Sequence, residues 1–383
     1  MAKARYIMIG GFLGAGKTTG VLQLARLLNQ QNLRVGLITN DQSHGLVDTS
    51  LLSSHGFPVE EITGGCFCCK FNSLANASAR LSKNQQPDVF IAEPVGSCTD
   101  LKATVDYPLR RMYGDNYRIA PLSVMVDPIR ALRILELEPG KSFSRKVVYI
   151  YRKQLEEADI IIINKIDLLQ PERLQTLRQA MDRHFSPARL LALSARQGRG
   201  LDNWLSAITK PLSCSPEDLE IDYTIYAEGE ALLGWLNCSV QLTSKSPFDG
   251  NTFLLDTVGV IQRRSRALNK EIAHLKITLT PDEHGQDIGV ANLVGSDLSP
   301  ELSHSLKESL ETGQLIVNLR AESTPDILRS VVQDTFAGLQ QNGELDLKVE
   351  HMECFRPNRP TPTHRLKSSE SESLAEGGHS SAS

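Results

Sequence analysis

Residues 11–19 read Gly-Phe-Leu-Gly-Ala-Gly-Lys-Thr-Thr and fit the phosphate-binding pattern G-x-x-x-x-G-K-[ST]. This pattern needs a buried strand before it and a helix after it. Tyr6–Ile9 is a short apolar run, and the apolar residues between Lys17 and Asn29 have the spacing of one helix face. The stretch therefore predicts an α/β fold that binds a nucleoside triphosphate. The alternative is a chance glycine-rich turn.

The loop predicts specific roles for its residues. Backbone N–H groups turn inward around the phosphates, and the following helix directs its positive dipole end at them. Lys17 would reach the β- and γ-phosphates, and the Thr18 hydroxyl would bind Mg²⁺. The residues expected to hold the phosphates are Gly11, Gly14, Ala15, Gly16, Lys17, Thr18 and Thr19.

Apolar runs recur along the first 210 residues, and each ends in a polar motif. Amphipathic helical patterns separate several of them, which predicts a mainly parallel sheet with helices on both faces. Ligands of such sheets bind at the carboxyl ends of the strands, so the polar motifs should converge on one site. The runs are Arg34–Thr39, Val89–Ala92, Leu122–Val126, Ile160–Ile163 and Leu190–Leu193.

The remaining chain differs in pattern, and a length of 383 residues fits roughly two to three domains. We expect a P-loop GTPase domain over 1–210, a linker over 211–221, a smaller α+β domain over 222–358 and a disordered tail over 359–383. The α+β domain should place its helices on one face of an antiparallel sheet. Its predicted elements are strand 235–242, helix 253–268, strands 274–280, 289–294 and 315–319, helix 326–339 and strand 345–354.

Charge and hydropathy narrow the class of protein. The net charge is −4 and no basic patch stands out, so a nucleic-acid-binding protein is not expected. Apolar runs such as Ile160–Ile163 are too short to span a bilayer, so no membrane association is expected either. Met1–Arg5 leaves no room for a targeting segment before the first strand. We expect a cytoplasmic protein.

Asn164-Lys165-Ile166-Asp167 predicts selectivity for guanine. The Asp167 carboxylate can accept two hydrogen bonds from guanine, whereas adenine presents an acceptor at N1 and would leave the carboxylate unpaired. Asn164 would contact the Hoogsteen edge, the Lys165 stem would lie against the base, and Ser194 and Ala195 would complete the pocket. GTP is therefore favoured over ATP, and an ordinary strand-end turn is the alternative.

Two further segments are predicted to respond to the γ-phosphate. Glu93 ends the 89–92 run, where its carboxylate would hold a water on Mg²⁺, and Gly96 would donate its N–H to the γ-phosphate. The alternative is a strand-end Glu-Pro turn. In the loop after residue 39, Asp41 is a candidate for positioning the attacking water.

Three closely spaced cysteines, Cys66, Cys68 and Cys69, predict a transition-metal site. Thiolates favour Zn²⁺, Cu(I) or iron–sulfur clusters, and a tetrahedral Zn²⁺ needs a fourth ligand. His44 and Asp41 are the candidates, with a solvated loop as the alternative. Redox pairing or a free thiol is the alternative for the cysteines.

Other cysteines and histidines are interpreted as structural. Cys98 and Cys238 lie in apolar surroundings typical of a core, and Cys214 lies in the linker. A second metal site at His351, Cys354 and His364 is less favoured than an exposed strand and tail. No arginine finger can be assigned.

Four of these motifs together resemble the CobW-like GTPases, metal-handling relatives of the nickel-insertion GTPases UreG and HypB. They are the phosphate loop, Gly65–Cys69, Glu93–Gly96 and Glu157–Asp167. The resemblance implies a GTP-hydrolysing metallochaperone with GTP, Mg²⁺ and Zn²⁺ as ligands. Cobalt is the second metal, since some members serve cobalamin synthesis. It also implies slow hydrolysis without a partner and transfer of metal to a metalloprotein client; nucleotide-dependent homodimerisation is left open.

This chain departs from the family pattern in its switch segments. The usual E-N-E-F-G-E loop is Thr39–His44 here, the usual E-T-[ST]-G is Glu93–Gly96, and the histidine-rich insert of many members is absent. These departures indicate a divergent subgroup. Two other classes stay open: an assembly or signalling GTPase whose cysteines sense redox state, and a non-hydrolysing metal store.

Overall fold

The structure is a computed structural model that describes residues 3–40, 52, 53, 55–210, 218–282, 287–341 and 343–370. These residues form two compact units. The first unit contains residues up to 137, residues 149–223 and the described residues from 360 onward; the second contains 138–148 and 224–359. The predicted switch residues Asp41 and His44, and most of the predicted linker, lie outside the described residues.

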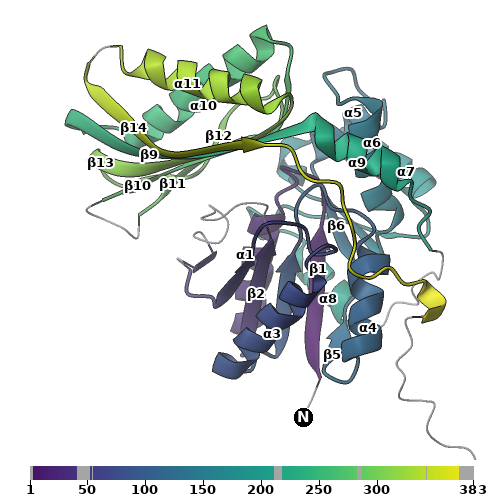
Figure 1. Ribbon diagram of the computed structural model, residues 1–383. Helices are drawn as coiled ribbons and strands as arrows, with labels where there is room; N and C mark the ends of the chain where they lie inside the picture. The colour runs from purple at the N-terminus through teal and green to yellow at the C-terminus, as the bar shows by residue number, and fades with distance from the viewer. Residues whose placement is uncertain are drawn as a thin grey trace, which may run out of the picture. The chain divides into compact units, whose positions relative to one another are not determined.

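The first unit is built on a parallel sheet, as predicted (Figure 1). Every pairing among its described strands is parallel, and β1 lies between β4 and β6. In spatial order the strands are β3 (Val59–Ile62), β2 (Val35–Asn40), β4 (Val89–Glu93), β1 (Ala4–Gly10), β6 (Ser123–Val126), β7 (Ile160–Ile163) and β8 (Arg189–Ala192), with β5 (Tyr117–Ile119) also paired to β1. The sequence did not predict β3 or β5, which are short and only partly apolar.

Helices cover both faces of this sheet (Figure 1). Ile7 and Ile9 of β1 pack in one core with Leu24 of the first helix and the buried Trp204. Side chains alternate along a strand, so Tyr6 faces the other way, where its ring stacks on Phe90 with centroids 5.9 Å apart. The helices are α1 (Lys17–Gln30), α3 (Phe71–Gln85), α4 (Tyr107–Tyr113), α5 (Pro128–Ile134), α6 (Arg145–Glu156), α7 (Pro171–His184) and α8 (Leu201–Thr209), with short helical turns at Lys102–Asp106, Ile166–Leu168 and Ser368–Glu370.

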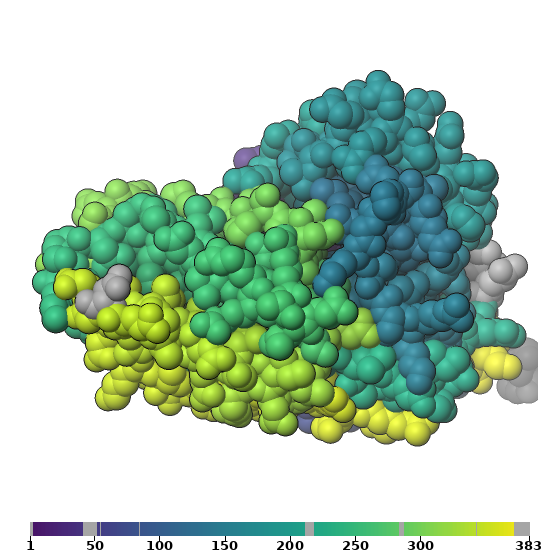
Figure 2. All heavy atoms as spheres, turned by 90° about the horizontal axis from the view of Figure 1, so that it is seen from above, coloured from purple at the N-terminus to yellow at the C-terminus, as the bar shows by residue number. Residues whose placement is uncertain are grey.

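The second unit is an antiparallel sheet with helices α10 and α11 on one face, as predicted. Figure 2 shows the atoms of this unit from above, in colours from green to yellow. Leu254, Ile261, Val332 and Phe336 of the two helices pack on the sheet's buried residues. In spatial order the strands are β12 (Glu301–His304), β11 (Gly289–Leu293), β10 (Glu271–Pro281), β13 (Leu310–Glu322), β9 (Leu233–Phe248) and β14 (Leu345–Phe355), and the helices are α9 (Tyr223–Leu232), α10 (Gly250–Ala267) and α11 (Pro325–Leu339).

The C-terminal segment differs from the predicted disordered tail over residues 360–370. These residues form hydrogen bonds with the first unit, including Leu366 N–H to Ala103 O at 2.9 Å. The segment is polar and proline-containing, so it has no periodicity that a sequence pattern would detect. Its backbone groups are satisfied by distant residues instead of by a helix or sheet of its own. Among the described residues, no helix is long and apolar enough to cross a membrane.

Candidate nucleotide and metal site

The phosphate loop joins β1 to α1 at the carboxyl end of the sheet. Gly11, Gly14 and Gly16 all have positive φ, a conformation that side-chain-bearing residues rarely adopt. Gly16 is also required by space, because a Cβ there would lie 2.5 Å from Asn164 Nδ2. Lys17, Thr18 and Thr19 then form the first turn of α1, and Lys17 is buried. The free N–H groups of this turn are a ready site for phosphate.

Thr18 and Glu93 meet above the sheet although they are 75 residues apart. Thr18 Oγ1 donates a hydrogen bond to Glu93 Oε1 at 3.0 Å. Glu93 is the last residue of β4 and is buried. A hydroxyl and a carboxylate at this spacing, beside a phosphate loop, fit Mg²⁺, which prefers oxygen ligands and keeps several waters.

Gly96 lies directly against the phosphate loop. A Cβ on Gly96 would stand 3.0 Å from Leu13 N and 2.9 Å from a Leu13 methyl group, so only glycine permits this approach. The Gln154 side chain supports the segment by donating to Gly96 O at 3.0 Å and to Cys98 O at 2.8 Å. The segment after β4 therefore lies in contact with the phosphate loop, next to the position expected for the nucleotide phosphates.

The Asn164–Asp167 motif follows β7 and is fastened to the phosphate loop. Asn164 Nδ2 donates to Ala15 O at 2.9 Å, while Asn164 Oδ1 accepts the Ala195 N–H at 3.0 Å. The sequence analysis predicted that Asn164 contacts the Hoogsteen edge of the base. In the structure its side-chain amide connects the phosphate loop to the Ser194-Ala195 segment. Asp167 is exposed, so its carboxylate is accessible to a guanine base, and Ser194 is buried.

Lys165 has a partner that the sequence analysis missed. Its Nζ donates to Gly14 O at 2.8 Å and to Asp127 Oδ2 at 2.9 Å. Burial opposes ionisation of Asp127, but the charges of Lys165 and Arg130 outweigh it and hold the pKa of Asp127 below its usual value. Arg130 also donates to Leu13 O and lies over the Phe12 ring. The position of Asp127 at the end of an apolar run was the signal that could have identified it.

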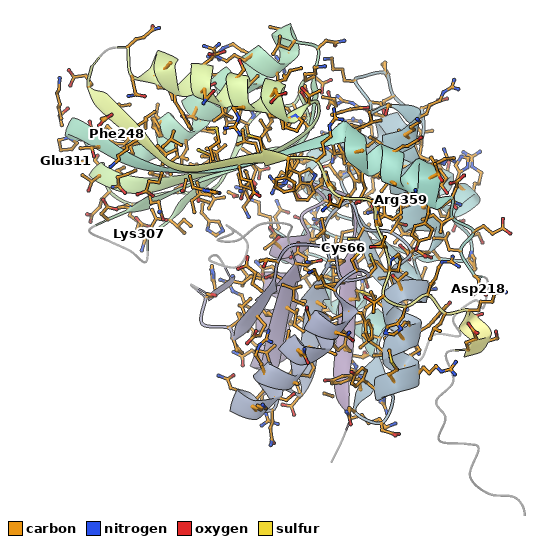
Figure 3. The ribbon with its side chains drawn as sticks, viewed as in Figure 1. Cys66, Asp218, Phe248, Lys307, Glu311 and Arg359 are labelled. Atoms are coloured by element: carbon orange, nitrogen blue, oxygen red, sulfur yellow. The ribbon has the colours of Figure 1, made fainter. Side chains whose placement is uncertain are left out.

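The cysteine loop connects β3 to α3, and Cys66 lies near the carboxyl ends of the strands (Figure 3). The Sγ–Sγ distances are 2.7 Å for Cys66–Cys68, 3.4 Å for Cys66–Cys69 and 3.6 Å for Cys68–Cys69. A tetrahedral Zn²⁺ with Zn–S bonds of about 2.3 Å would set sulfurs about 3.8 Å apart. Two of the distances nearly match, and the third requires an opening of about 1 Å. The residues therefore fit a zinc ion.

The pKa values of the three thiols shift in different directions. The hydrogen bonds that Cys66 shares with Cys68 and Cys69 lower the pKa of the Cys66 thiol well below its usual value, and the same contacts raise the pKa of Cys68 and of Cys69. Cys66 is thus the thiol of the group that loses its proton most readily. Cys66 and Cys68 are buried and Cys69 is half-buried.

Cys98 and Asn40 also belong to this region, although the sequence analysis assigned Cys98 to the core. Cys98 is buried, as predicted, and its thiol is a hydrogen-bonding neighbour of Cys66. Asn40 Nδ2, at the end of β2, donates to Ile62 O at 3.0 Å and to Gly65 O at 2.7 Å. Its neighbour Thr39 pairs with Glu93 in the sheet. The cysteine loop is thus attached to β2, and the γ-phosphate segment, Glu93–Gly96, follows the adjacent strand β4.

The remaining histidine and cysteine candidates do not form a second cluster among the described residues. Cys238 is a core residue of β9, as predicted. Cys354 and His351 lie on β14. His364 packs edge-on against Phe71 of α3, with ring centroids 5.1 Å apart.

Comparison with known proteins agrees with this geometry. Residues 5–190 match the family described as CobW/HypB/UreG, nucleotide-binding domain. The zinc chaperone YeiR of Escherichia coli is 32% identical over 174 residues, covering 45% of this chain and 49% of YeiR. The zinc-regulated GTPase metalloprotein activator 1 of Dictyostelium discoideum is 27% identical over 214 residues, covering 48% and 44%. The chain thus spans about half the length of the curated relatives it matches.

Among solved structures, HypB of Archaeoglobus fulgidus aligns with a TM-score of 0.37 and 20% identity, over 53% of this chain and 87% of HypB. Zn(II)-bound YjiA GTPase of E. coli aligns with a TM-score of 0.35 and 16% identity, over 89% and 100%. The sequence match and the motifs carry the assignment. Residues 5–190 of this chain belong to the CobW/HypB/UreG family of nucleotide-binding domains.

Proposed function

We propose that this protein is a GTP-hydrolysing metallochaperone. It binds a transition metal, zinc in the first place and cobalt as the alternative, at Cys66, Cys68 and Cys69. GTP state controls transfer of that metal to a metalloprotein client. The observation that carries the proposal is the attachment of the thiol loop and the γ-phosphate segment to adjacent strands, β2 and β4.

Nucleotide binding uses the phosphate loop and the Asn164–Asp167 motif. Mg²⁺·GTP binds with its phosphates on Gly11–Thr19 and its guanine on Asp167. Thr18 and Glu93 would hold Mg²⁺, which would neutralise charge on the phosphates. One relative is named a zinc-regulated GTPase metalloprotein activator, which supports both the nucleotide and the metal.

Metal gating follows from the connections between the two sites. The γ-phosphate draws in Gly96, and the shift reaches the thiol loop through β4, β2 and Asn40. Bound metal must then change GTP affinity by the same factor as GTP changes metal affinity, typically about 1–3 kcal/mol. Asp41 and His44, in the loop after β2, are the proposed further ligands or water-positioning groups. We place the protein in the cytoplasm, where thiols stay reduced.

Zinc affinity tests the proposal. It is measured by chelator competition under reducing conditions with Mg²⁺ plus a non-hydrolysable GTP analogue, and again with Mg²⁺·GDP. A several-fold difference that is lost in Cys66→Ser and kept in the control Cys354→Ser supports a nucleotide-gated chaperone. Equal affinities in the two nucleotide states contradict it. Binding without any phosphate release from GTP would instead identify a metal store, and no zinc binding with turnover sensitive to thiol oxidation would identify a redox-sensing GTPase.

A further inference from the structure

The C-terminal segment lies on the cysteine loop. Thr361 N–H donates to Cys69 Sγ at 3.2 Å. Thr363 N–H donates to Cys68 O at 2.9 Å, and its Oγ1 donates to Cys69 O at 3.1 Å. Three donors from a segment almost 300 residues away therefore bind two consecutive residues of the thiol site.

An ion pair with a buried carboxylate fastens the same segment close to Gly96. Arg365 Nε donates to Asp100 Oδ2 at 2.8 Å, and Tyr223 donates its hydroxyl to the same oxygen at 2.6 Å. The Asp100 side chain is 1% exposed, whereas that of Arg365 is 40% exposed. A carboxylate so buried needs its cation, so Asp100 is a specific anchor for Arg365.

Further contacts continue on either side of Arg365. His364 packs on Phe71, two residues after Cys69, and Leu366 N–H donates to Ala103 O. Ser368 N–H donates to Asp218 Oδ1 at 2.7 Å. The segment is thus held along its length and not at one point.

Asp100 connects this segment to the nucleotide site. Asp100 is four residues beyond Gly96 in the sequence. The Gln154 side chain donates hydrogen bonds to Gly96 O and to Cys98 O, which lies between Gly96 and Asp100. A shift of Gly96 toward a γ-phosphate therefore moves the anchor of Arg365. Cys69 is the most accessible of the three thiols, since Cys66 and Cys68 are buried. Thr361 therefore contacts the thiol that is most open to an incoming reagent.

We propose that residues 360–367 form a strap that closes the cysteine site. While the strap is seated, its Thr361 N–H binds Cys69 Sγ and the segment blocks access to the cysteine site. When Asp100 moves, Arg365 releases the strap and the metal can be transferred. The identity of the cargo rests on the proposed function; the strap's cover over the thiols does not.

The test uses two matched pairs of variants in the full chain. Thr361→Pro removes the N–H that binds Cys69, whereas Thr361→Ala keeps it. Arg365→Ala removes the anchor, whereas Arg178→Ala removes an exposed arginine of α7 in the same unit. Two rates are measured: modification of the thiols of the metal-free protein by an aromatic disulfide reagent, and loss of Zn²⁺ to excess chelator.

We expect Thr361→Pro and Arg365→Ala to accelerate both rates at least about tenfold, and the controls to stay within about twofold. Thiol rates equal to those of the wild type would overturn the strap. If the wild type binds no zinc, the proposed function fails and the thiol rates still decide the strap. If zinc binds but the variants release it at the wild-type rate, the strap fails and the proposed function stands. Should Thr361→Pro not fold, Thr363→Val, which removes one donor on Cys69 O, replaces it.

Discussion

Thr18 Oγ1 donates a hydrogen bond to Glu93 Oε1 across 3.0 Å and thereby joins the phosphate loop to the end of β4. These are the two side chains that the proposed function assigns to Mg²⁺. The pair thus links the phosphate loop to β4, whose neighbour β2 ends at Asn40, and Asn40 donates to Gly65 O in the cysteine loop. Its chemistry leads to the first prediction.

Glu93→Gln should raise the Mg²⁺ concentration needed for half-maximal GTP hydrolysis by about 10–100-fold, the usual effect of losing a group that orients a metal's ligands. The amide keeps the size of the side chain but not its charge. The measurement is single-turnover phosphate release across a Mg²⁺ titration. Glu172→Gln on the exposed start of α7 is the control, and an unchanged Mg²⁺ dependence in Glu93→Gln would exclude the magnesium role.

Asp167→Asn should weaken GTP binding at least about a hundredfold, because the amide cannot accept both guanine hydrogen bonds and leaves buried donors unpaired. The same variant should gain affinity for xanthosine triphosphate, whose 2-oxo group accepts from the new amide N–H. Fluorescent-nucleotide competition measures both affinities. Asp182→Asn, exposed on α7, serves as control; loss of GTP binding with no gain for the xanthine nucleotide would argue that Asp167 is structural.

Zinc binding should release about two protons near neutral pH, one each from Cys68 and Cys69, since metal-bound thiols are deprotonated. Cys66 contributes none because hydrogen bonds from its neighbours already lower its pKa. Zinc affinity should therefore rise with pH by about two log units per pH unit. Calorimetry in buffers of different ionisation enthalpy gives the proton count. Cys69→Ser should reduce the count by about one and Cys354→Ser should leave it unchanged; a count of three would show that Cys66 is a thiol.

Glu157 should make the protein less stable as the pH rises. Burial, helped by the charge of Asp100, raises the pKa of Glu157 from 4.5 to about 8, with its oxygens bonded by Thr99 Oγ1 and Lys102 N–H. The folded state binds the proton more tightly than the unfolded state. Its stabilising effect is therefore complete below pH 4.5 and is lost as the pH rises through about 8.

Glu157→Gln should consequently gain stability over the wild type by up to about 1.4 kcal/mol per pH unit between about pH 5 and 8. Urea unfolding at several pH values measures the difference. Glu156→Gln changes the adjacent, more exposed carboxylate and should run parallel to the wild type. Parallel curves for Glu157→Gln as well would mean that Glu157 is ionised in the folded protein.

Much of the fold was predictable because its signals are local. The strand, loop and helix around Gly11–Thr19 can be predicted from a pattern of a few residues, and so can the strand Ile160–Ile163. The strand predicted over residues 289–294 is likewise present as β11 (Gly289–Leu293). Val59–Ile62 and Glu301–His304 were missed because Ile62 alone among their residues is buried, so no alternation or apolar run marks them.

The sequence by itself determined the parallel sheet, the phosphate loop, the guanine motif and the thiol group, because each is encoded by neighbouring residues whose chemistry is read directly. Only the tertiary structure decided that Lys165 pairs with Asp127, that Cys98 lies beside Cys66, and that Thr361 donates to Cys69. These contacts join residues from 32 to 292 positions apart along the printed sequence. Their formation depends on where the strands end in space, and no local periodicity carries that information.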